Sequence, residues 1–493
     1  MRHFFLVILV LFGSICFFKL IELESSILVK KEIIDNTPTI SFLPSEENSD
    51  LLVFVAHGFA GSASFMKPIA ISLAKTGHHT ITFDFLGHGR HLLPYSGNIM
   101  TEDGATKMFV NQISALIQYY LRQENKSKAI IIGHSMASDL IFRAALQNEN
   151  IIGSIGISNY TDVITRENPS NTLIINGIWE PSLRSKAVEI LKSIGITNPQ
   201  EDVLYGSFRD GSARQISTIQ NADHVGILYS TKTQKAVNDW INQITENELK
   251  LSTNNLGMWA LLSFVCLFLL FIAVIQYLPK NGMKLMEISF GNCFGGNIMA
   301  LILTPLLLYF YLPNWSPFTS QNYLINHLLL YALLASLFSN VGIKKLGLKD
   351  FNLAIFTGLI VFFLFGFGSV LDRYVSTFYL SDSRVGVFFL LLFGCIPITF
   401  YIQSFYQASQ TGTWKAAISK ISLLLSLALA IGLNLSELFL LGYAILLLCA
   451  FWLVFGFLGH LLLRRIGSSS SIGFANAITL SWTLAIAIPL YSP

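Results

Sequence analysis

A serine flanked by small residues is the side chain best suited to covalent chemistry in this sequence. The segment Gly133–Ala137 (GHSMA) follows the apolar run 129–132 and precedes an amphipathic stretch. This is a G-x-S-x-G elbow with alanine in its last position, and the elbow requires small residues because its turn is too tight for larger side chains. A helix that begins here points its first amides at a developing oxyanion. The segment therefore predicts a nucleophilic Ser135.

A serine hydroxyl is a weak nucleophile, so this chemistry requires partners. A neutral imidazole must accept the hydroxyl proton, and a carboxylate must fix the imidazole tautomer and stabilise the imidazolium. The chain has ten histidines, of which His134, inside the elbow, and His57 are expected to shape the pocket rather than to transfer protons. It has no H-E-x-x-H pattern, no cysteine pair and no G-x-x-x-x-G-K-[ST] loop. We therefore expect no metal and no cofactor.

The elements around this serine follow the pattern of a parallel sheet with crossover helices, because short apolar runs alternate with amphipathic stretches. The runs expected as buried strands are 51–56, 80–85, 129–132, 151–157 and 172–175. The stretches expected as helices are 64–74, 104–122, 137–146 and 181–194. About 200 residues suffice for one such domain with its own core. The sequence therefore predicts a doubly wound domain with Ser135 at the carboxyl edge of its sheet.

Over residues 50–245 the sequence resembles the α/β-hydrolase superfamily. The segment 53–62 (VFVAHGFAGS) is similar to the His-Gly loop after the family's third strand. The segment 83–89 (FDFLGHG) is similar to its structural D-x-x-G-x-G turn. The resemblance implies a mostly parallel sheet with helices on both faces. It also implies that the backbone N–H groups of Phe59 and Met136 form an oxyanion hole.

The same resemblance implies the base and the acid. The family keeps its histidine near the end of the domain, where this chain has His224. Its carboxylate follows a strand in a G-x-x-acid arrangement, and Glu180 takes that position in 173–180 (LIINGIWE), with glutamate in place of the usual aspartate. Asp162 is the alternative acid, whereas Asp223 adjoins the histidine and is expected to point elsewhere. The implied triad is Ser135, Glu180 and His224.

Two further features concern the surroundings of the site. Only 158–171 separates the two strands between which the family inserts its lid, so we expect a minimal lid and an open site. Arg209 and Arg214 lie between the acid and the histidine in sequence. They either rim the site and bind an anionic group such as a phosphate headgroup, or form surface ion pairs with Asp202 or Asp210.

The composition adds a membrane region to this domain. Of 493 residues, 53% are hydrophobic and 12% are charged. The charged share is roughly half that of a typical soluble protein. The net charge of +3 gives no reason to expect nucleic acid as a partner. We expect an uncleaved anchor in 1–24, the hydrolase domain in 25–250 and an all-α bundle of about eight spans in 251–493. The expected spans are 4–21, 258–278, 294–312, 323–341, 352–371, 385–405, 417–435, 438–462 and 471–490.

Lysine and arginine predict the orientation of these spans. With a cytoplasmic N-terminus, the opposite hinges hold only Arg373 and Arg384, beside Asp372 and Asp382. We therefore expect a multi-pass protein of the plasma membrane, the inner membrane in a bacterium, with its hydrolase domain outside the cytoplasm. The cytoplasmic hinges then hold nine positive charges: Lys280, Lys284, Lys344, Lys345, Lys349, Lys415, Lys420, Arg464 and Arg465.

These features predict a membrane-bound serine hydrolase. The expected substrate is an ester or thioester, lipid or lipid-linked, because a tethered site meets lipids at high local concentration. The same acyl-enzyme also supports acyl transfer. A peptidase or amidase with the same triad is the first alternative, and a transporter or assembly protein whose hydrolase-like domain only binds is the second. The sequence leaves the oligomeric state open.

Overall fold

A computed structural model describes residues 2–46, 50–97, 102–281, 288–341, 350–407 and 412–492 of the chain. Four residues of the predicted cytoplasmic hinges lie outside these ranges: Lys284, Lys344, Lys345 and Lys349. The chain divides into two compact units. The sheet unit comprises Ser14–Ser263 and Val370–Thr377, and the helical unit comprises Met1–Gly13, Phe264–Ser369 and Phe378–Pro493.

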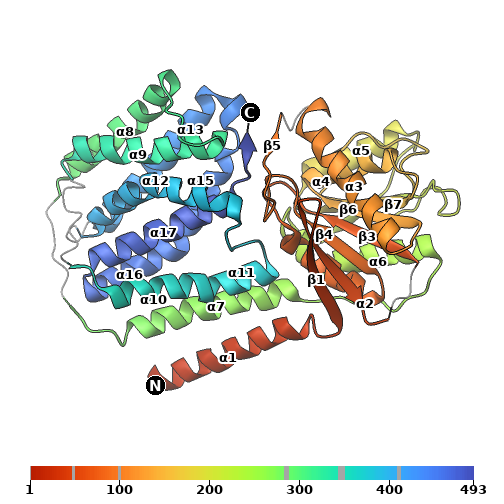
Figure 1. Ribbon diagram of the computed structural model, residues 1–493, viewed down its shortest axis with the longest axis horizontal. Coiled ribbons are helices and arrows are strands. Elements are labelled where there is room, and N and C mark those ends of the chain that lie inside the picture. The colour runs from red at the N-terminus through yellow and green to blue at the C-terminus, as the bar shows by residue number, and fades with distance from the viewer. Residues whose placement is uncertain are drawn as a thin grey trace. The chain divides into compact units, whose positions relative to one another are not determined.

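The sheet unit contains a mixed sheet whose central strands are parallel (Figure 1). Its order is β1-β2-β4-β3-β6-β7-β8-β9, in which β4 to β9 run parallel and the β1–β2 hairpin joins the edge at β4 in antiparallel fashion. The strands are β1 (Ile27–Ile34), β2 (Thr37–Pro44), β3 (Leu51–Ala56), β4 (His79–Phe83), β6 (Lys128–His134), β7 (Ile151–Ile157), β8 (Thr172–Gly177) and β9 (Arg214–Ile219). The two-residue strands are β5 (Tyr95–Ser96) and β10 (Tyr491–Ser492).

Helices cover both faces of this sheet, because its strands are apolar on both sides. Val53 and Val55 of β3 pack in one core cluster with Ile69 of α2. Phe54, which points to the opposite face, packs edge-on against Tyr120 of α3. On the first face α2 packs against α6, and on the second α3 packs against α4. The helices are α2 (Lys67–Thr76), α3 (Lys107–Gln123), α4 (Met136–Leu146), α5 (Pro181–Ser193) and α6 (Thr231–Thr245).

The predicted fold class is confirmed, with three additions that the sequence pattern did not indicate. The five expected strands correspond to β3, β4, β6, β7 and β8, and the four expected helices to α2 to α5. The β1–β2 hairpin, strand β9 and helix α6 were not expected. β1 alternates exposed and partly buried residues at the sheet edge, so it carries little of the apolar signal that marks a buried strand.

Nine helices in the described part of the chain are long and apolar enough to cross a membrane, and they correspond to the nine expected spans. Two of these spans are composite, since α10 continues into α11 and α15 into α16. The helices are α1 (Arg2–Glu22), α7 (Leu256–Ile275), α8 (Phe290–Phe310), α9 (Thr319–Ser339), α10 (Leu353–Val361), α11 (Gly368–Tyr374), α12 (Asp382–Tyr406), α13 (Gly412–Leu433), α14 (Leu435–Leu438), α15 (Leu441–Phe451), α16 (Phe457–Ile466) and α17 (Ser469–Ala487).

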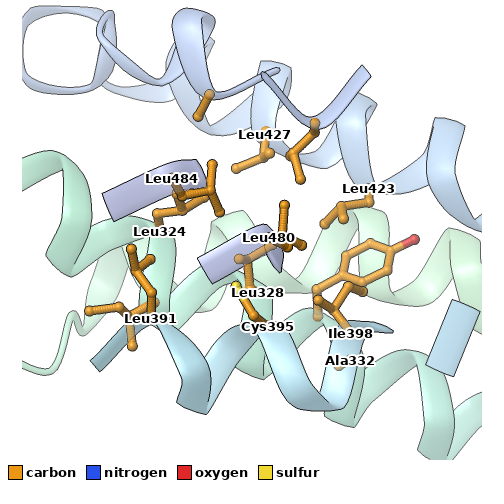
Figure 2. Close-up of a cluster of buried hydrophobic side chains, with 14 of the residues drawn as sticks. Leu324, Leu328, Ala332, Leu391, Cys395, Ile398, Leu423, Leu427, Leu480 and Leu484 are labelled. Carbon is orange, nitrogen blue, oxygen red and sulfur yellow. The ribbon is translucent and has the colours of Figure 1, made fainter. Parts of the chain in front are cut away.

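The core of the helical unit is built where α12 packs against α9, α13 and α17. Figure 2 shows leucines of these four helices meeting side chain to side chain, among them Leu324, Leu391, Leu427 and Leu484. Glycine permits the close approach that such packing requires in lipid. A Cβ on Gly394 of α12 would lie 2.8 Å from the Leu328 Cβ of α9. The two helices therefore meet almost backbone to backbone.

Candidate active site

Ser135 occupies the tight turn between β6, which ends at His134, and α4, which begins at Met136. Its φ is 53° and its ψ is −119°, a region that costs strain for a residue with a side chain. The Ser135 N–H donates to the Ile157 carbonyl of the neighbouring strand β7 at 2.9 Å. This bond fixes the turn to the sheet, so the hydroxyl is held at the strand's carboxyl end.

Small residues allow this turn to close. A Cβ on Gly133 would collide with the backbone of Ala137. A Cβ on Gly58, in the loop after β3, would lie 3.0 Å from both the His134 carbonyl oxygen and the Ser135 Cβ. Glycine is therefore required at 133, and a side chain at 58 would crowd the elbow.

His224 lies beside the serine, in the loop that follows β9. Its Nε2 is 2.8 Å from the Ser135 Oγ, and its Nδ1 is 2.6 Å from the Glu180 Oε1. Both distances are those of hydrogen bonds. With the proton on Nδ1 donated to the carboxylate, Nε2 accepts from the serine hydroxyl. The imidazole side chain is 48% exposed, so the site is open to solvent.

Glu180 ends the turn between β8 and α5, and it is buried. Its Oε2 accepts from the Gly177 N–H at 2.7 Å and from the Ser158 hydroxyl at 2.9 Å. Burial acts to raise the pKa of the Glu180 carboxyl, but the hydrogen bonds from His224, Gly177 and Ser158 outweigh it and hold that pKa below its ordinary value of 4.5. The carboxylate therefore stays ionised at neutral pH and faces the imidazole as an anion.

The two other candidate acids lie elsewhere. The Asp162 side chain is 72% exposed, and its salt-bridge partner is Lys186 at 4.0 Å. The Asp223 Oδ1 accepts from the Val225 N–H at 3.0 Å and from the Gly226 N–H at 2.5 Å. Asp223 therefore closes the turn that carries His224 and does not contact the imidazole through its carboxylate.

The residues expected to supply the oxyanion hole flank the serine. Met136 is the first residue of α4, and Phe59 lies in the turn after β3, next to the glycine that packs on the Ser135 Cβ. Among the hydrogen bonds of the described residues, neither the Phe59 N–H nor the Met136 N–H has an acceptor in the turns, loops and caps. Both amides are therefore available to an oxyanion formed at the serine.

A hydrogen-bonded frame holds the Phe59 loop. The His57 Nε2 accepts from the Phe85 N–H at 3.1 Å, and its Nδ1 donates to the Gly58 carbonyl at 2.7 Å. The Asp84 carboxylate accepts from the Ala63 N–H at 2.7 Å. Burial lowers the pKa of His57, which keeps the ring neutral. His57 and the D-x-x-G-x-G turn thus support the loop without touching the nucleophile.

Two residues support the triad: His134, which was expected to shape the pocket, and Ser158, which was not expected to take part. His134 donates from Nε2 to the His224 carbonyl at 2.8 Å, and burial lowers the pKa of His134 to about 4. Its neutral ring therefore orients the loop that carries the base. Ser158, at φ 51° after β7, donates to Glu180. The only sequence signal for Ser158 is its place directly after a strand whose end faces the elbow.

Neither arginine takes a predicted role. The Arg214 guanidinium is buried and donates to the carbonyls of Gly211 and Ala213 at 3.1 and 2.9 Å and to two carbonyls of the loop before β8. Arg209 is exposed, with Glu246 as its salt-bridge partner at 3.8 Å. Among the described residues no group of three histidine, cysteine or acidic side chains is arranged to hold a metal ion.

Known proteins resemble the sheet unit. Residues 47–201 match a family model described as serine aminopeptidase, S33, and no curated protein matches the chain. Similar solved structures include a CIB-like hydrolase from Thermoplasma acidophilum, at 14% identity over 44% of this chain and 98% of that one, with a TM-score of 0.34. A soluble variant of monoglyceride lipase from Saccharomyces cerevisiae is 13% identical over 45% of this chain and 96% of its own, with a TM-score of 0.32.

The family match covers the strands that carry the elbow and the acid, and the sheet has the mostly parallel order that the resemblance implied. The chain therefore contains an α/β-hydrolase domain and is a serine hydrolase of the α/β-hydrolase type, joined to helices that are apolar enough to span a membrane.

Proposed function

We propose that this protein is a membrane-anchored hydrolase that cleaves an acyl ester or thioester of a lipid-like substrate outside the cytoplasm. Its catalytic triad is Ser135, His224 and Glu180. The observation that carries the proposal is the unbroken chain of hydrogen bonds from the serine hydroxyl through the imidazole to the buried carboxylate, with lengths of 2.8 and 2.6 Å.

The reaction has two halves. In the first, the Ser135 Oγ attacks the acyl carbon while the His224 Nε2 takes its proton, and the Phe59 and Met136 amides stabilise the oxyanion. The imidazolium, stabilised by Glu180, then protonates the leaving alcohol or thiol as the acyl–oxygen or acyl–sulfur bond breaks. In the second half, water or an acceptor alcohol gives its proton to the imidazole and attacks the acyl-enzyme. Water yields a free acid, and an alcohol yields a new ester.

Apolar side chains beside the triad support a lipid-like acyl group. Trp179 is 64% exposed and precedes Glu180, and Val225 is 49% exposed and follows His224. The Trp179 N–H donates to the Ala222 carbonyl at 3.2 Å, so the acid loop and the histidine loop are joined at this rim. Exposed apolar residues that cluster at a site favour an apolar ligand. Membrane spans in the same chain keep the site near lipids.

The charge pattern supports the side of the membrane. Among the short hinges between the predicted spans, every second hinge carries most of the hinge lysines and arginines. Hinges with such an excess of positive charge are cytoplasmic. A single span, α1, separates the N-terminus from the sheet unit. With the N-terminus in the cytoplasm, the triad therefore acts on the opposite side.

A peptidase or amidase remains a second candidate because the matched family model is described as a serine aminopeptidase. The triad would act on an amide in the same way, with His224 protonating the departing amine. A purely binding domain is disfavoured, since its function would not require an ionised carboxylate, an imidazole and a hydroxyl in a hydrogen-bonded chain.

The test uses the full-length protein in nanodiscs with three substrates that share one long acyl chain and differ in the bond, as ester, thioester or amide. We expect turnover of the ester or thioester, and its loss in Ser135→Ala. A wild type that cleaves only the amide would transfer the assignment to an amidase. Equal ester turnover by wild type and Ser135→Ala would refute the proposed triad.

A further inference from the structure

A segment distant in sequence belongs to the sheet unit. Val370–Thr377, here named the strap, comprises the end of α11 and the first residues after it, yet it belongs to the same compact unit as Ser14–Ser263. The chain on either side of the strap belongs to the helical unit. The hydrolase domain therefore includes residues from the end of a candidate membrane span and from the segment just after it.

The strap is bound to the end of the Phe59 loop, which we define as the oxyanion loop, residues 57–63. The Thr377 N–H donates to the Ser62 Oγ at 3.0 Å, and the Ser376 Oγ lies 3.3 Å from the same atom. The Ser64 hydroxyl donates to the Asp372 carbonyl at 3.2 Å. Ser62 and Ser64 are both buried, so these bonds form away from water and hold the loop end in place.

An ion pair forms a second link between the strap and this loop. The Asp372 carboxylate pairs with the Arg90 guanidinium. The Arg90 N–H donates to the Asp84 Oδ2 at 2.9 Å, while the Asp84 Oδ1 accepts from the Ala63 N–H at 2.7 Å. The last residue of the oxyanion loop is thus linked to the strap through two carboxylates and one arginine.

A buried charge cluster anchors the strap to the rest of the unit. The Arg373 Nε and an Nη atom donate to the Glu24 Oε2 at 3.0 and 2.7 Å. The Glu24 Oε1 in turn binds the Lys67 Nζ at 2.8 Å, and the Lys67 side chain is only 3% exposed. Glu24 and Lys67 are both buried, so each of these charges depends on its partners for compensation. The strap is therefore held firmly at Arg373.

We propose that the strap positions the oxyanion loop, so that the Phe59 N–H points at the oxyanion. This inference rests on the proposed triad mechanism and adds a positioning role for Asp372 and Ser62, neither of which touches the substrate. Ser62 follows Phe59 by three residues, and the turn between them is closed by the Gly61 N–H donating to the Gly58 carbonyl at 3.0 Å. A displacement at Ser62 is therefore passed directly to the Phe59 amide.

The helices that carry the strap then support catalysis, in addition to anchoring the hydrolase domain in the membrane. The strap, which is the end of α11 and the residues just after it, supplies two hydrogen bonds and an ion pair to the frame of the oxyanion loop. Since an oxyanion donor acts on the transition state more than on bound substrate, a loosened strap slows the chemical step and leaves substrate binding unchanged.

The test compares full-length wild type with Ser62→Ala and Asp372→Asn in nanodiscs, using the ester defined above. Ser62→Ala removes the acceptor of the Thr377 N–H, and Asp372→Asn removes the charge that binds Arg90. Deleting an oxyanion donor costs about 10²–10³-fold in kcat, so displacing one is expected to lower kcat between about tenfold and 100-fold. KM should stay within about twofold.

A transition-state analogue separates positioning from a general structural effect. A trifluoromethyl ketone forms an oxyanion on Ser135, so its Ki should rise in each strap variant by the factor by which kcat/KM falls. Glu201→Gln is the matched control, because it breaks a partly exposed ion pair with Arg184 at 2.8 Å that has no link to the oxyanion loop. This control should keep the wild-type kcat and Ki.

Thermal unfolding of each variant is measured first, and Ser62→Ala decides the question if Asp372→Asn fails to fold. Wild-type kcat and Ki in the folded strap variants would overturn the positioning role while Ser135-dependent turnover stands. A rise in KM with unchanged kcat would overturn it as well. A wild type without Ser135-dependent turnover would overturn the proposed function and this inference together.

Discussion

Replacing Glu180 by glutamine removes one negative charge while keeping the size of the side chain, and the surrounding donors decide which way the amide points. In the native site, the Oε2 atom accepts from the Gly177 N–H at 2.7 Å and from the Ser158 hydroxyl at 2.9 Å. The glutamine oxygen takes this position because two donors face it, so its NH₂ group faces the His224 Nδ1. That nitrogen must then accept, which moves the proton to Nε2, and Nε2 can no longer take the proton of Ser135.

The magnitude follows from this reversed tautomer. In a serine protease, the equivalent carboxylate-to-amide change leaves the geometry intact and lowers kcat about 10⁴-fold, which corresponds to about 5.5 kcal/mol in the activation free energy. Glu180→Gln keeps the hydrogen bonds to Gly177 and Ser158, so we expect it to fold. KM should change little, because the carboxylate is buried behind the imidazole and does not reach the substrate.

Ester turnover by the purified full-length protein measures this effect, with circular dichroism as the check on folding. Asp162→Asn is the matched control, since it also converts a carboxylate to an amide but lies at an exposed position; it should keep nearly all activity. A loss of less than about tenfold in Glu180→Gln, or a larger loss in Asp162→Asn, would refute the assignment of the acid.

Three other predictions concern stability, the histidine loop and topology. Because the pKa of Glu180 lies below 4.5 in the folded protein, its carboxylate stabilises the fold above that value and the contribution is lost as pH falls through the folded pKa. The difference in melting temperature between wild type and Glu180→Gln should therefore narrow below about pH 4, and a constant difference would contradict this. His134→Leu deletes the donor to the His224 carbonyl and should cost about 1 kcal/mol in the free energy of unfolding and lower kcat, as urea unfolding and ester assays would measure; unchanged values would exclude this support. Tags after Ser45 and at the C-terminus should both react with an impermeant reagent in intact cells, and protection of either would reverse the proposed orientation.

The apolar pattern was sufficient to predict the central strands and the spans. β3 and β7 begin and end where the apolar runs 51–56 and 151–157 do, because a strand buried on both faces is apolar throughout. β9 was missed because it begins with Arg214, whose guanidinium donates to the carbonyls of Thr165 and Arg166, which are brought close by the fold. A buried arginine of this kind has no local signature in the sequence.

The candidate residues of the site follow from local motifs in the sequence, whereas the hydrogen bonds that support them do not. The elbow around Ser135 is a local motif, so spacing alone indicates it. Ser158 and His134 act through hydrogen bonds to Glu180 and His224, which lie 22 and 90 residues away in sequence. The bond between Ser64 and the strap spans 308 residues. Contacts at such separations depend on the folded arrangement, which no window of sequence contains.

The covalent intermediate on Ser135 tests the central claim most directly. The measurement is mass spectrometry of the full-length protein after brief reaction with an activated long-chain ester, followed by peptide mapping, in parallel with Ser135→Ala. The triad mechanism predicts one acyl adduct, on Ser135, and no adduct and only residual turnover in the variant. An adduct on another residue, or full turnover by Ser135→Ala, would contradict the account.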